Sequence, residues 1–372
     1  MNTDTDTPQT DLKELLAQAH LLQQLIAAPS LSGEEAKTAK ILTDYFRRQG
    51  ITPERIFNNV IVKSKDYDPS RPTLMLCSHH DTVKPVPSYT RDPFDPAYQM
   101  DDQGRTRLYG LGSNDAGGCV VSLCGAFMHF WKEAEEGRPL SFNLLLALCG
   151  EEEMSGEHGV QAVLPEYPEI TCAIVGEPTH MQAAIGERGL LVMDGYTKGK
   201  AGHAARNNGI NALYLAIDDI QTLRGKQFEK VSEIMGPITI QVTQIESGTQ
   251  HNVIPDSCHY VVDIRTTDAY SNQEVVDSLQ TGLHSILMPR NLHNKASVTP
   301  TDHPLIDAIR KLRLPPLISP TTSDWMRINV PAVKIGPGDS PRSHSADEFI
   351  YLDQIQEGTR GYCNLISALE LE

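Results

Sequence analysis

Four short apolar runs in this chain are each followed by residues that can bind metal ions or move protons. Such continuous runs are typical of buried strands in a mostly parallel sheet. In open α/β sheets the functional site lies at the carboxyl ends of the strands, so we predict that these residues meet at one edge of the sheet. The runs and the polar residues after them are Thr73–Ser78 with His79, His80 and Asp81, Phe142–Cys149 with Glu151, Glu152 and Glu153, Cys172–Val175 with Glu177, and Ala332–Ile335 with His344 and Glu348.

The remaining pattern of the first half predicts helices between these strands. Apolar residues recur at helical spacing over residues 11–28, and the first ten residues, rich in Thr, Asp and Pro, are predicted to be disordered. Ser32 with Glu35 has the spacing of a capping box and predicts a second helix that ends at Gly50. The other predicted elements are a strand at Val60–Val62, a long loop at Lys84–Arg107 and a helix at Cys119–Glu136.

The pattern changes near Ile185 to an order of strand, helix, two strands, helix and strand. This order predicts a small α+β sandwich. We therefore predict an α/β catalytic domain with a mostly parallel sheet, formed by residues 1–184 and 298–372 and interrupted by an inserted α+β domain at 185–297. The predicted elements of the insertion are a strand at Gly189–Gly199, a helix at Asn211–Leu223, strands at Ile238–Ile245 and Cys258–Thr266, a helix at Asn272–Ile286 and a strand near Ala296–Thr299.

The length and composition of the chain restrict its class. A chain of 372 residues suits two domains, and a net charge of −16 at pH 7 argues against nucleic acid or an anionic membrane as partner. No apolar run reaches the length of a transmembrane helix, and the polar first residues lack the features of a signal peptide. The seven Cys form no Cys-x-x-Cys pair, which indicates a reducing compartment, so we predict a cytoplasmic protein.

Five of the polar residues form a candidate metal-binding set with nitrogen and oxygen donors only. An open catalytic zinc site has three protein ligands, so five donors suit two metal ions about 3.5–4 Å apart that share a bridging carboxylate. Asp115 taken alone would be an ordinary helix N-cap, but beside four other ligands we interpret it as the bridge. Two Zn²⁺ are expected, with Co²⁺ or Mn²⁺ as substitutes. The proposed ligands are His79, Asp115, Glu153, Glu177 and His344.

The residue types also indicate a general base and substrate contacts. Adjacent Glu side chains cannot occupy one position, so one member of the triplet at 151–153 can bind metal while a neighbour faces the substrate as general base. The triplet leaves this register open by one residue. In the predicted insertion, His203 follows a glycine, Asn252 lies near a strand edge, and Arg265 could grip a substrate carboxylate with two hydrogen bonds. Spacing alone does not separate a structural from a functional role for these three.

The motifs around these residues resemble those of the di-zinc aminoacylase and carboxypeptidase family, which includes acetylornithine deacetylase and succinyl-diaminopimelate desuccinylase. They span nearly the whole chain in the family's order. Two positions depart from the family, since the chain has Asp115-Ala-Gly-Gly where Asp-Met-Lys-Gly-Gly is frequent, and Glu151 where Asp is usual. The matching motifs are Ser-His79-His-Asp81-Thr-Val, Gly-Leu-Gly-Ser-Asn-Asp115, Glu151-Glu152-Glu153 with Gly159, Gly-Glu177-Pro-Thr, Gly-Lys-Ala-Gly-His203, Asn252-Val-Ile-Pro, and Gly-Pro-Gly with Ser-His344.

The resemblance implies how the two zinc ions would be bound. Both ions would share Asp115 as the bridging carboxylate. One ion would also be bound by His79 and Glu177, and the other by Glu153 and His344.

The resemblance also implies roles for residues that do not bind metal. Glu152 would act as general base, and Asp81 would orient the histidine ligand beside it. The insertion would be a lid and dimerisation domain of a homodimer, in which His203 of the partner subunit would stabilise the oxyanion. Asn252 and Arg265 would help to hold the substrate.

Two local motifs resemble the acetylornithine deacetylase branch most closely, namely Gly-Glu-Arg-Gly-Leu and Gly-His-Ala-Ala-Arg-Asn. This implies removal of an acetyl or succinyl group from the α-amine of ornithine, in arginine biosynthesis. A succinyl group would add a carboxylate, for which Arg206 is a candidate partner. The alternatives are a di- or tripeptidase or another N-acyl-amino acid deacylase. A metal-binding protein without catalysis would be expected to have lost a ligand or the base, whereas every expected position is filled.

Overall fold

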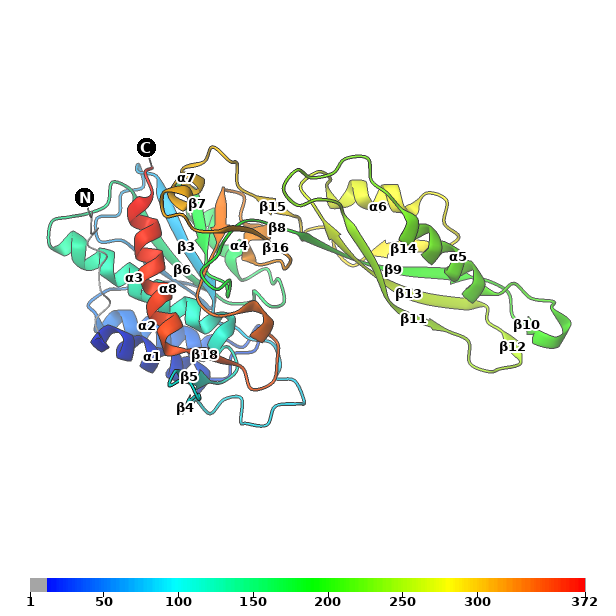
Figure 1. Ribbon diagram of the computed structural model, residues 1–372, viewed down its shortest axis with the longest axis horizontal. Helices are drawn as coiled ribbons and strands as arrows, with labels where there is room; N and C mark the ends of the chain where they lie inside the picture. The colour runs from blue at the N-terminus through cyan, green and yellow to red at the C-terminus, as the bar shows by residue number, and fades with distance from the viewer. Residues whose placement is uncertain (1–11, 372) are drawn as a thin grey trace. The chain divides into compact units, whose positions relative to one another are not determined.

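The computed structural model describes residues 12–371, so the ten residues predicted to be disordered lie outside the described part, as do residues 11 and 372. The described chain forms two compact units, whose elements are labelled in Figure 1. The first unit comprises residues 12–185, 299–317 and 323–371, and the second comprises residues 186–298 and 318–322. No described helix is both long and apolar enough to cross a membrane.

The first unit is built around a sheet whose central strands are parallel. Its strands follow the order β1-β2-β6-β3-β7-β17-β8. The four strands from β6 to β17 run parallel to one another, whereas β1, β2 and β8 are antiparallel to their neighbours. This confirms the predicted mostly parallel sheet. The strands are β1 Glu54–Ile56, β2 Asn59–Lys63, β3 Thr73–His79, β6 Asn143–Cys149, β7 Ile170–Val175, β8 Ala183–Glu187 and β17 Ala332–Lys334, with β16 Pro316–Ser319 also paired to β8.

Both faces of this sheet are buried, which explains why its strands are continuous apolar runs. Leu74 and Leu76 of β3 point into a core formed with α1, α2, α3, α7 and α8. Met75 and Cys77, which alternate with them, point into a second core formed with α4 and the short helix η4. The helices of the first unit are α1 Leu12–Ile26, α2 Ala36–Arg48, α3 Gly118–Glu135, α4 Val160–Val163, α7 Pro304–Lys311 and α8 Leu352–Ala368, with short turns η1 Ser113–Gly117, η2 Leu164–Glu166, η4 Asp324–Arg327 and η5 Ser340–Arg342.

Two local predictions in the first unit are wrong. The predicted capping box is absent, because α2 has no side-chain cap and Ser32 donates its hydroxyl to Asp81 instead. The segment predicted as one long loop contains β4 (Ala97–Met100) and β5 (Thr106–Tyr109), which form a small sheet with β18 (Phe349–Tyr351). Ser32 thus bonds to a residue 49 positions away, whereas β4 and β5 pair with each other as a local hairpin to which the distant β18 is added.

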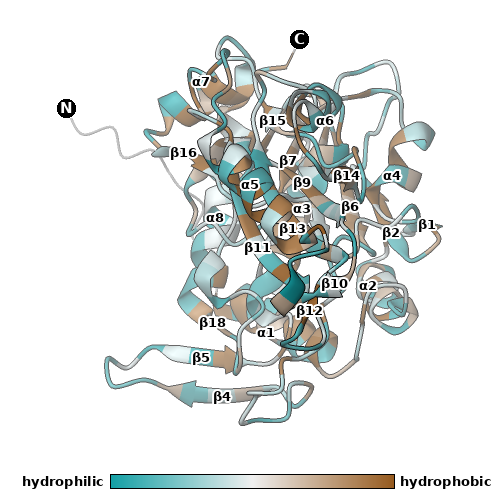
Figure 2. Ribbon diagram, turned by 90° about the vertical axis from the view of Figure 1, so that its right-hand side faces the viewer, coloured by the Kyte–Doolittle hydropathy of each residue, from teal (hydrophilic) through white to brown (hydrophobic). Residues whose placement is uncertain are grey.

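The second unit is an antiparallel four-stranded sheet with order β11-β13-β9-β14. One face is covered by two helices, because alternate residues such as Leu191, Tyr260 and Val262 pack with Ala216 and Val275 in one core. Along α5, hydrophobic and hydrophilic residues are mixed (Figure 2), as expected for a helix with one face on a sheet. The elements are β9 Gly189–Lys198, β10 Gly202–His203, η3 Ala204–Arg206, α5 Ala212–Gly225, β11 Thr239–Ser247, β12 Val253–Ile254, β13 Ser257–Thr266, α6 Asn272–Gln280, β14 Ile286–Pro289 and β15 Ser297–Val298.

The last strand of the second unit was predicted at the wrong place. We expected a helix to Ile286 and a strand near residues 296–299, whereas α6 ends at Gln280 and the fourth strand of the sheet is Ile286–Pro289. The short strand at Ser297–Val298 exists, but it pairs with β8 rather than with the four-stranded sheet. The helical spacing of the apolar residues extended the prediction beyond the true end of α6.

Candidate metal centre

The five proposed ligands all belong to the first unit, and all of them except Asp115 lie at or beyond the carboxyl ends of its elements. His79 is the last residue of β3, and Asp115 lies in the turn η1 that precedes α3. Glu153 follows β6, Glu177 follows β7, and His344 follows the turn η5 beyond β17. Because β6, β3, β7 and β17 are parallel, their carboxyl ends meet at one edge of the sheet.

The structure brings these five side chains into two groups that share Asp115. His79 Nε2 lies 3.2 Å from Asp115 Oδ1 and 3.7 Å from Glu177 Oε1. His344 Nε2 lies 3.0 Å from Glu153 Oε1 and 3.7 Å from Asp115 Oδ2. Within each group the donor atoms lie within 4.8 Å of one another. The two oxygens of Asp115 therefore face different histidines, as a carboxylate between two metal ions would.

The charges in this cluster also fit bound divalent cations. Burial, together with the nearby Asp115 carboxylate and against the opposing effect of His79, raises the pKa of Glu177 to about 8. Burial lowers the pKa of His79, but hydrogen bonding to Asp115 and other carboxylates outweighs burial and raises it well above its ordinary value. The hydrogen bond to Glu153 raises the pKa of His344 to about 9. The cluster thus retains protons that metal ions would displace, and its nitrogen and oxygen donors suit Zn²⁺, Mn²⁺ or Co²⁺.

Asp81 links the histidine ligand of β3 to the loop after β6. His79 Nδ1 lies 3.1 Å from the backbone carbonyl oxygen of Asp81 and 3.5 Å from its Oδ1. The same carboxylate accepts hydrogen bonds from the backbone N–H groups of Glu152 and Glu153, both at 3.1 Å, and from the Ser32 hydroxyl at 2.7 Å. Asp81 therefore restrains His79 and the two loop residues together.

The three consecutive Glu residues point to different partners. Glu151 accepts from the backbone N–H of His158 at 3.0 Å, so its carboxylate is directed to the other end of its own loop. Glu153 contacts His344, and Glu152 has an oxygen within 4.8 Å of donor atoms of His79 and Glu153. Burial raises the pKa of Glu152 well above its usual range, and the Glu177 carboxylate adds to this effect although His79 opposes it. A carboxyl group with a raised pKa can both accept and donate a proton, as a general base and acid must.

Glu35 supports this loop, a role that we did not predict from the sequence. Its side chain is fully buried. Glu35 Oε1 accepts from the backbone N–H groups of Gly33 and, at 3.2 Å, Glu151, while Oε2 accepts from Asn58 Nδ2 at 2.9 Å. Asn59 adds a further restraint, since its Oδ1 accepts from the Gly150 N–H at 3.0 Å. The polar loop after β6 is therefore held by buried side chains from the segment before β3.

Glu348 has a similar supporting role that we did not predict, although its position after the fourth strand run was noted. Its buried carboxylate accepts the backbone N–H groups of Gly112, Asn114 and Asp115 at 3.1, 2.8 and 2.9 Å. Burial and the Asp115 carboxylate together raise the pKa of Glu348 to about 8, although its hydrogen bonds from backbone N–H groups oppose them. These hydrogen bonds fix the glycine-rich turn that carries Asp115.

The other proposed residues belong to the second unit. His203 and Asn252 are neighbours there, because the Ala204 N–H donates to the Asn252 carbonyl at 3.0 Å, and the His203 side chain is exposed. Arg206 is also exposed, in the turn η3. Arg265 lies near the opposite end of β13 and donates from Nε to Asp263 Oδ1 at 2.9 Å. The structure thus groups the first three residues and pairs the fourth with a neighbouring carboxylate.

The chain is similar to known proteins along most of its length. Residues 185–289 match the family model of the peptidase dimerisation domain. The chain is 27% identical over 366 residues to an acetylornithine deacetylase from Proteus mirabilis. This alignment covers 89% of the chain and 91% of the deacetylase. The chain is also 26% identical over 374 residues to a succinyl-diaminopimelate desuccinylase from Delftia acidovorans. That alignment covers 90% of the chain and 94% of the desuccinylase.

A solved structure shares the whole fold. The YXEP protein of Bacillus subtilis, described as a dinuclear metal-binding peptidase of the M20 family, superposes with a TM-score of 0.72 over 97% of this chain and 100% of its own. The two sequences are 16% identical. At that identity the similarity shows a shared fold only, so any inference about the substrate must rest on the residues of this chain.

Proposed function

We propose that the chain is a metal-dependent hydrolase of the M20 peptidase family and that it removes the N-acyl group from the α-amine of an amino acid, with N-acetyl- or N-succinyl-ornithine as substrate. The observation that carries this proposal is Asp115, whose two oxygens face His79 and His344 in separate ligand groups next to Glu152. This geometry supports hydrolysis of a linear amide at a site for two metal ions.

The five ligands would hold two Zn²⁺, with Co²⁺ or Mn²⁺ as substitutes. Two such cations, when bound, polarise the amide oxygen and lower the pKa of an attacking water. Glu152 accepts a proton from that water on its carboxylate and then donates it to the nitrogen of the leaving amine. Its raised pKa suits both transfers. Asp81 keeps His79 in its rotamer and holds the backbone of Glu152, so base and ligand retain their relative position.

The second unit supplies the proposed substrate contacts. The match to a peptidase dimerisation domain supports a homodimer, in which His203 of the partner subunit would stabilise the oxyanion. Asn252 and Arg265 would bind the substrate, and Arg206 would pair with the additional carboxylate of a succinyl group. Arg265 must share its guanidinium with Asp263 in this role, since both residues already form a two-point pair.

A peptidase is the second candidate function, because the fold is shared with a dinuclear metal-binding peptidase. The two candidates differ in the group removed and share the metal chemistry. A peptidase would cleave di- or tripeptides and leave acyl-ornithine intact. A protein that binds metal without catalysis is less well supported, since Glu152 and all five ligands are present. The roles in arginine biosynthesis and in the cytoplasm stay predictions.

The test is release of free ornithine from N-acetyl-ornithine and N-succinyl-ornithine, measured side by side with Zn²⁺ and with chelator, together with a panel of di- and tripeptides. We expect release from one acyl-ornithine that chelator abolishes. Glu152→Gln should reduce turnover by at least about 10²–10⁴-fold while two metal ions stay bound, and Glu151→Gln is the matched control. Normal turnover by the Glu152 variant would exclude this residue as the base, and cleavage of peptides alone would move the proposal to the second candidate.

A further inference from the structure

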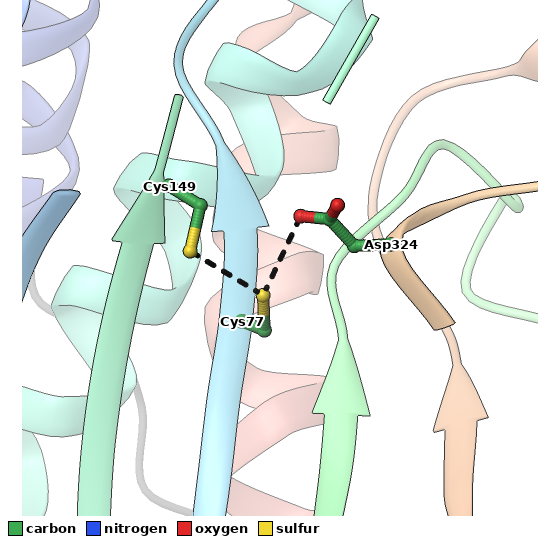
Figure 3. A group of neighbouring side chains, drawn as sticks. All are labelled: Cys77, Cys149 and Asp324. Atoms are coloured by element: carbon green, nitrogen blue, oxygen red, sulfur yellow. Dashed lines mark hydrogen bonds between the residues drawn. The ribbon is translucent and has the colours of Figure 1, made fainter. Parts of the chain in front are cut away.

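A second cluster of possible ligands lies in the first unit and shares no residue with the metal centre. Cys77 of β3 and Cys149 of β6 lie side by side, and Asp324 at the start of η4 points to them (Figure 3). Cys77 Sγ lies 3.9 Å from Cys149 Sγ and 3.8 Å from Asp324 Oδ2. Both thiols have no exposed surface and Asp324 is 6% exposed. Two sulfur atoms and a carboxylate oxygen therefore converge inside the core.

We propose that Cys77, Cys149 and Asp324 form a third cation site, which binds a thiophilic divalent ion such as Cd²⁺ or excess Zn²⁺. The spacing of the three atoms carries this inference. A tetrahedral zinc with Zn–S of about 2.3 Å and Zn–O of about 2.1 Å separates its ligands by roughly 3.8 Å for two sulfurs and roughly 3.6 Å for sulfur and oxygen. The observed separations of 3.9 and 3.8 Å are close to these values, and the three donor atoms all lie within 4.8 Å of one another.

The donor types separate this site from the metal centre. The centre offers only imidazole and carboxylate donors, whereas the new site offers two sulfurs, which favour softer ions. The two cysteines are both free, and their sulfurs are far beyond the disulfide bond length of about 2.05 Å. The two cysteines lie on adjacent parallel strands, and Cys149 is in register with His79 of the metal centre. An ion bound here would therefore connect β3, β6 and η4 next to the metal centre.

Binding at this site is balanced by release of protons. One divalent ion forms two bonds to sulfur, and each thiol loses its proton to solvent, so M²⁺ and two Cys–SH give M(S–Cys)₂ and two H⁺. Asp324 contributes an oxygen as the third ligand. Because a 2+ ion replaces two protons, the net charge of the buried cluster does not change, which avoids the large cost of adding an isolated charge to a protein core.

The test is a titration of the full-length protein, with both ions of the metal centre already bound as Zn²⁺ and with a phosphine reductant in place of a thiol. We expect Cd²⁺ to bind as a third ion per chain and to produce the ultraviolet charge-transfer absorption of a cadmium–thiolate bond. Calorimetry in two buffers of different ionisation enthalpy should give release of about two protons per ion. Cys77→Ala/Cys149→Ala should lose the absorption and the third ion, and Cys172→Ala, which removes a buried thiol from β7, should retain both.

Several outcomes would overturn the proposal. If the wild-type protein shows no cadmium–thiolate absorption, the cluster is a hydrogen-bonded group of thiols only, and this result does not depend on any variant. If the absorption persists in the double variant, another cysteine is the ligand. Asp324→Asn keeps both thiols and tests the third ligand even where the double variant does not fold, and we expect at least tenfold weaker Cd²⁺ binding. Unchanged Cd²⁺ affinity in that variant would remove Asp324 from the site.

Discussion

Replacement of Glu35 by Ala should damage the metal centre from a position that touches none of its ligand side chains. Glu35 receives three hydrogen bonds, two at Oε1 from the backbone N–H groups of Gly33 and Glu151 and one at Oε2 from Asn58. The Glu151 N–H belongs to the loop that carries Glu152 and Glu153. Alanine removes all three acceptors and leaves a cavity beside Gly150, whose Cα hydrogen faces the Glu35 carboxyl group.

The loss of stability depends on whether the N–H groups that now donate to Glu35 can form hydrogen bonds to water after the substitution. Gly33 is exposed, so its N–H can be hydrated after the substitution. The Glu151 N–H and the Asn58 amide are partly buried, and a buried donor without acceptor costs about 1–3 kcal/mol. We therefore expect a loss of about 2–4 kcal/mol in the free energy of unfolding. Turnover should fall by about 10–100-fold, since a displacement of about 1 Å at a catalytic group costs about 10²-fold.

The matched control is Glu35→Gln, because its single carbonyl oxygen can still accept both backbone N–H groups that Oε1 now accepts. Urea unfolding followed by the fluorescence of Trp131 and Trp325 reports stability, and acyl-ornithine hydrolysis with metal analysis reports the site. We expect the Gln variant to remain within about 1 kcal/mol of wild type. The reasoning is refuted if the Ala variant turns over normally, or if the Gln variant is as impaired as the Ala variant.

For three other perturbations the structure determines whether the measured property should rise or fall. Asp81→Asn places an amide N–H₂ against the N–H group of either Glu152 or Glu153, because each of these donates to a different oxygen of Asp81. Metal affinity or kcat should therefore fall by about 10–100-fold; metal analysis with kinetics would check this, and unchanged values would argue against the link. Chelator should lower the melting temperature, since bound metal stabilises the folded state, and it should also abolish hydrolysis. Re-addition of Zn²⁺ should restore the melting temperature in a calorimetric scan and the activity in the ornithine-release assay. The hydrogen bond from Arg290 lowers the pKa of Asp194 to about 2, so the stabilisation from this pair is present above about pH 4 and lost as the pH falls towards 2. The difference in melting temperature between wild type and Asp194→Asn should therefore shrink over that range, and a constant difference would contradict the assignment.

The parallel sheet could be predicted because each of its strands is buried on both faces. A strand such as Asn143–Cys149 has no exposed position, so its apolar run stands out without any knowledge of its neighbours. The same local signal failed at α6, where apolar residues at helical spacing continue into the strand Ile286–Pro289. That strand is defined by its pairing with β9, and pairing is not visible in a local pattern.

Residues of the site that end a strand were accessible to sequence reasoning, whereas the residues that support them were not. His79 and Glu177 follow apolar runs directly, so topology alone indicates that they lie at one edge. Glu35 and Glu348 act on backbone groups of Glu151 and Asp115, more than a hundred residues away along the chain. The feature that identifies these two residues is that their carboxylates are buried. Burial of a polar side chain can be recognised only when the fold is known.

The position of β17 has a consequence for the order in which the protein acquires its fold during synthesis. This strand lies between β7 and β8 in the sheet, yet the ribosome must make the whole second unit between β8 and β17. At about 5–20 residues per second this takes roughly 7–30 s. During that interval β7 presents an apolar strand edge with no neighbour, which is a template for pairing with other chains. A nascent chain arrested before Ala332 should therefore bind chaperones and aggregate, and release of the last forty residues should end both.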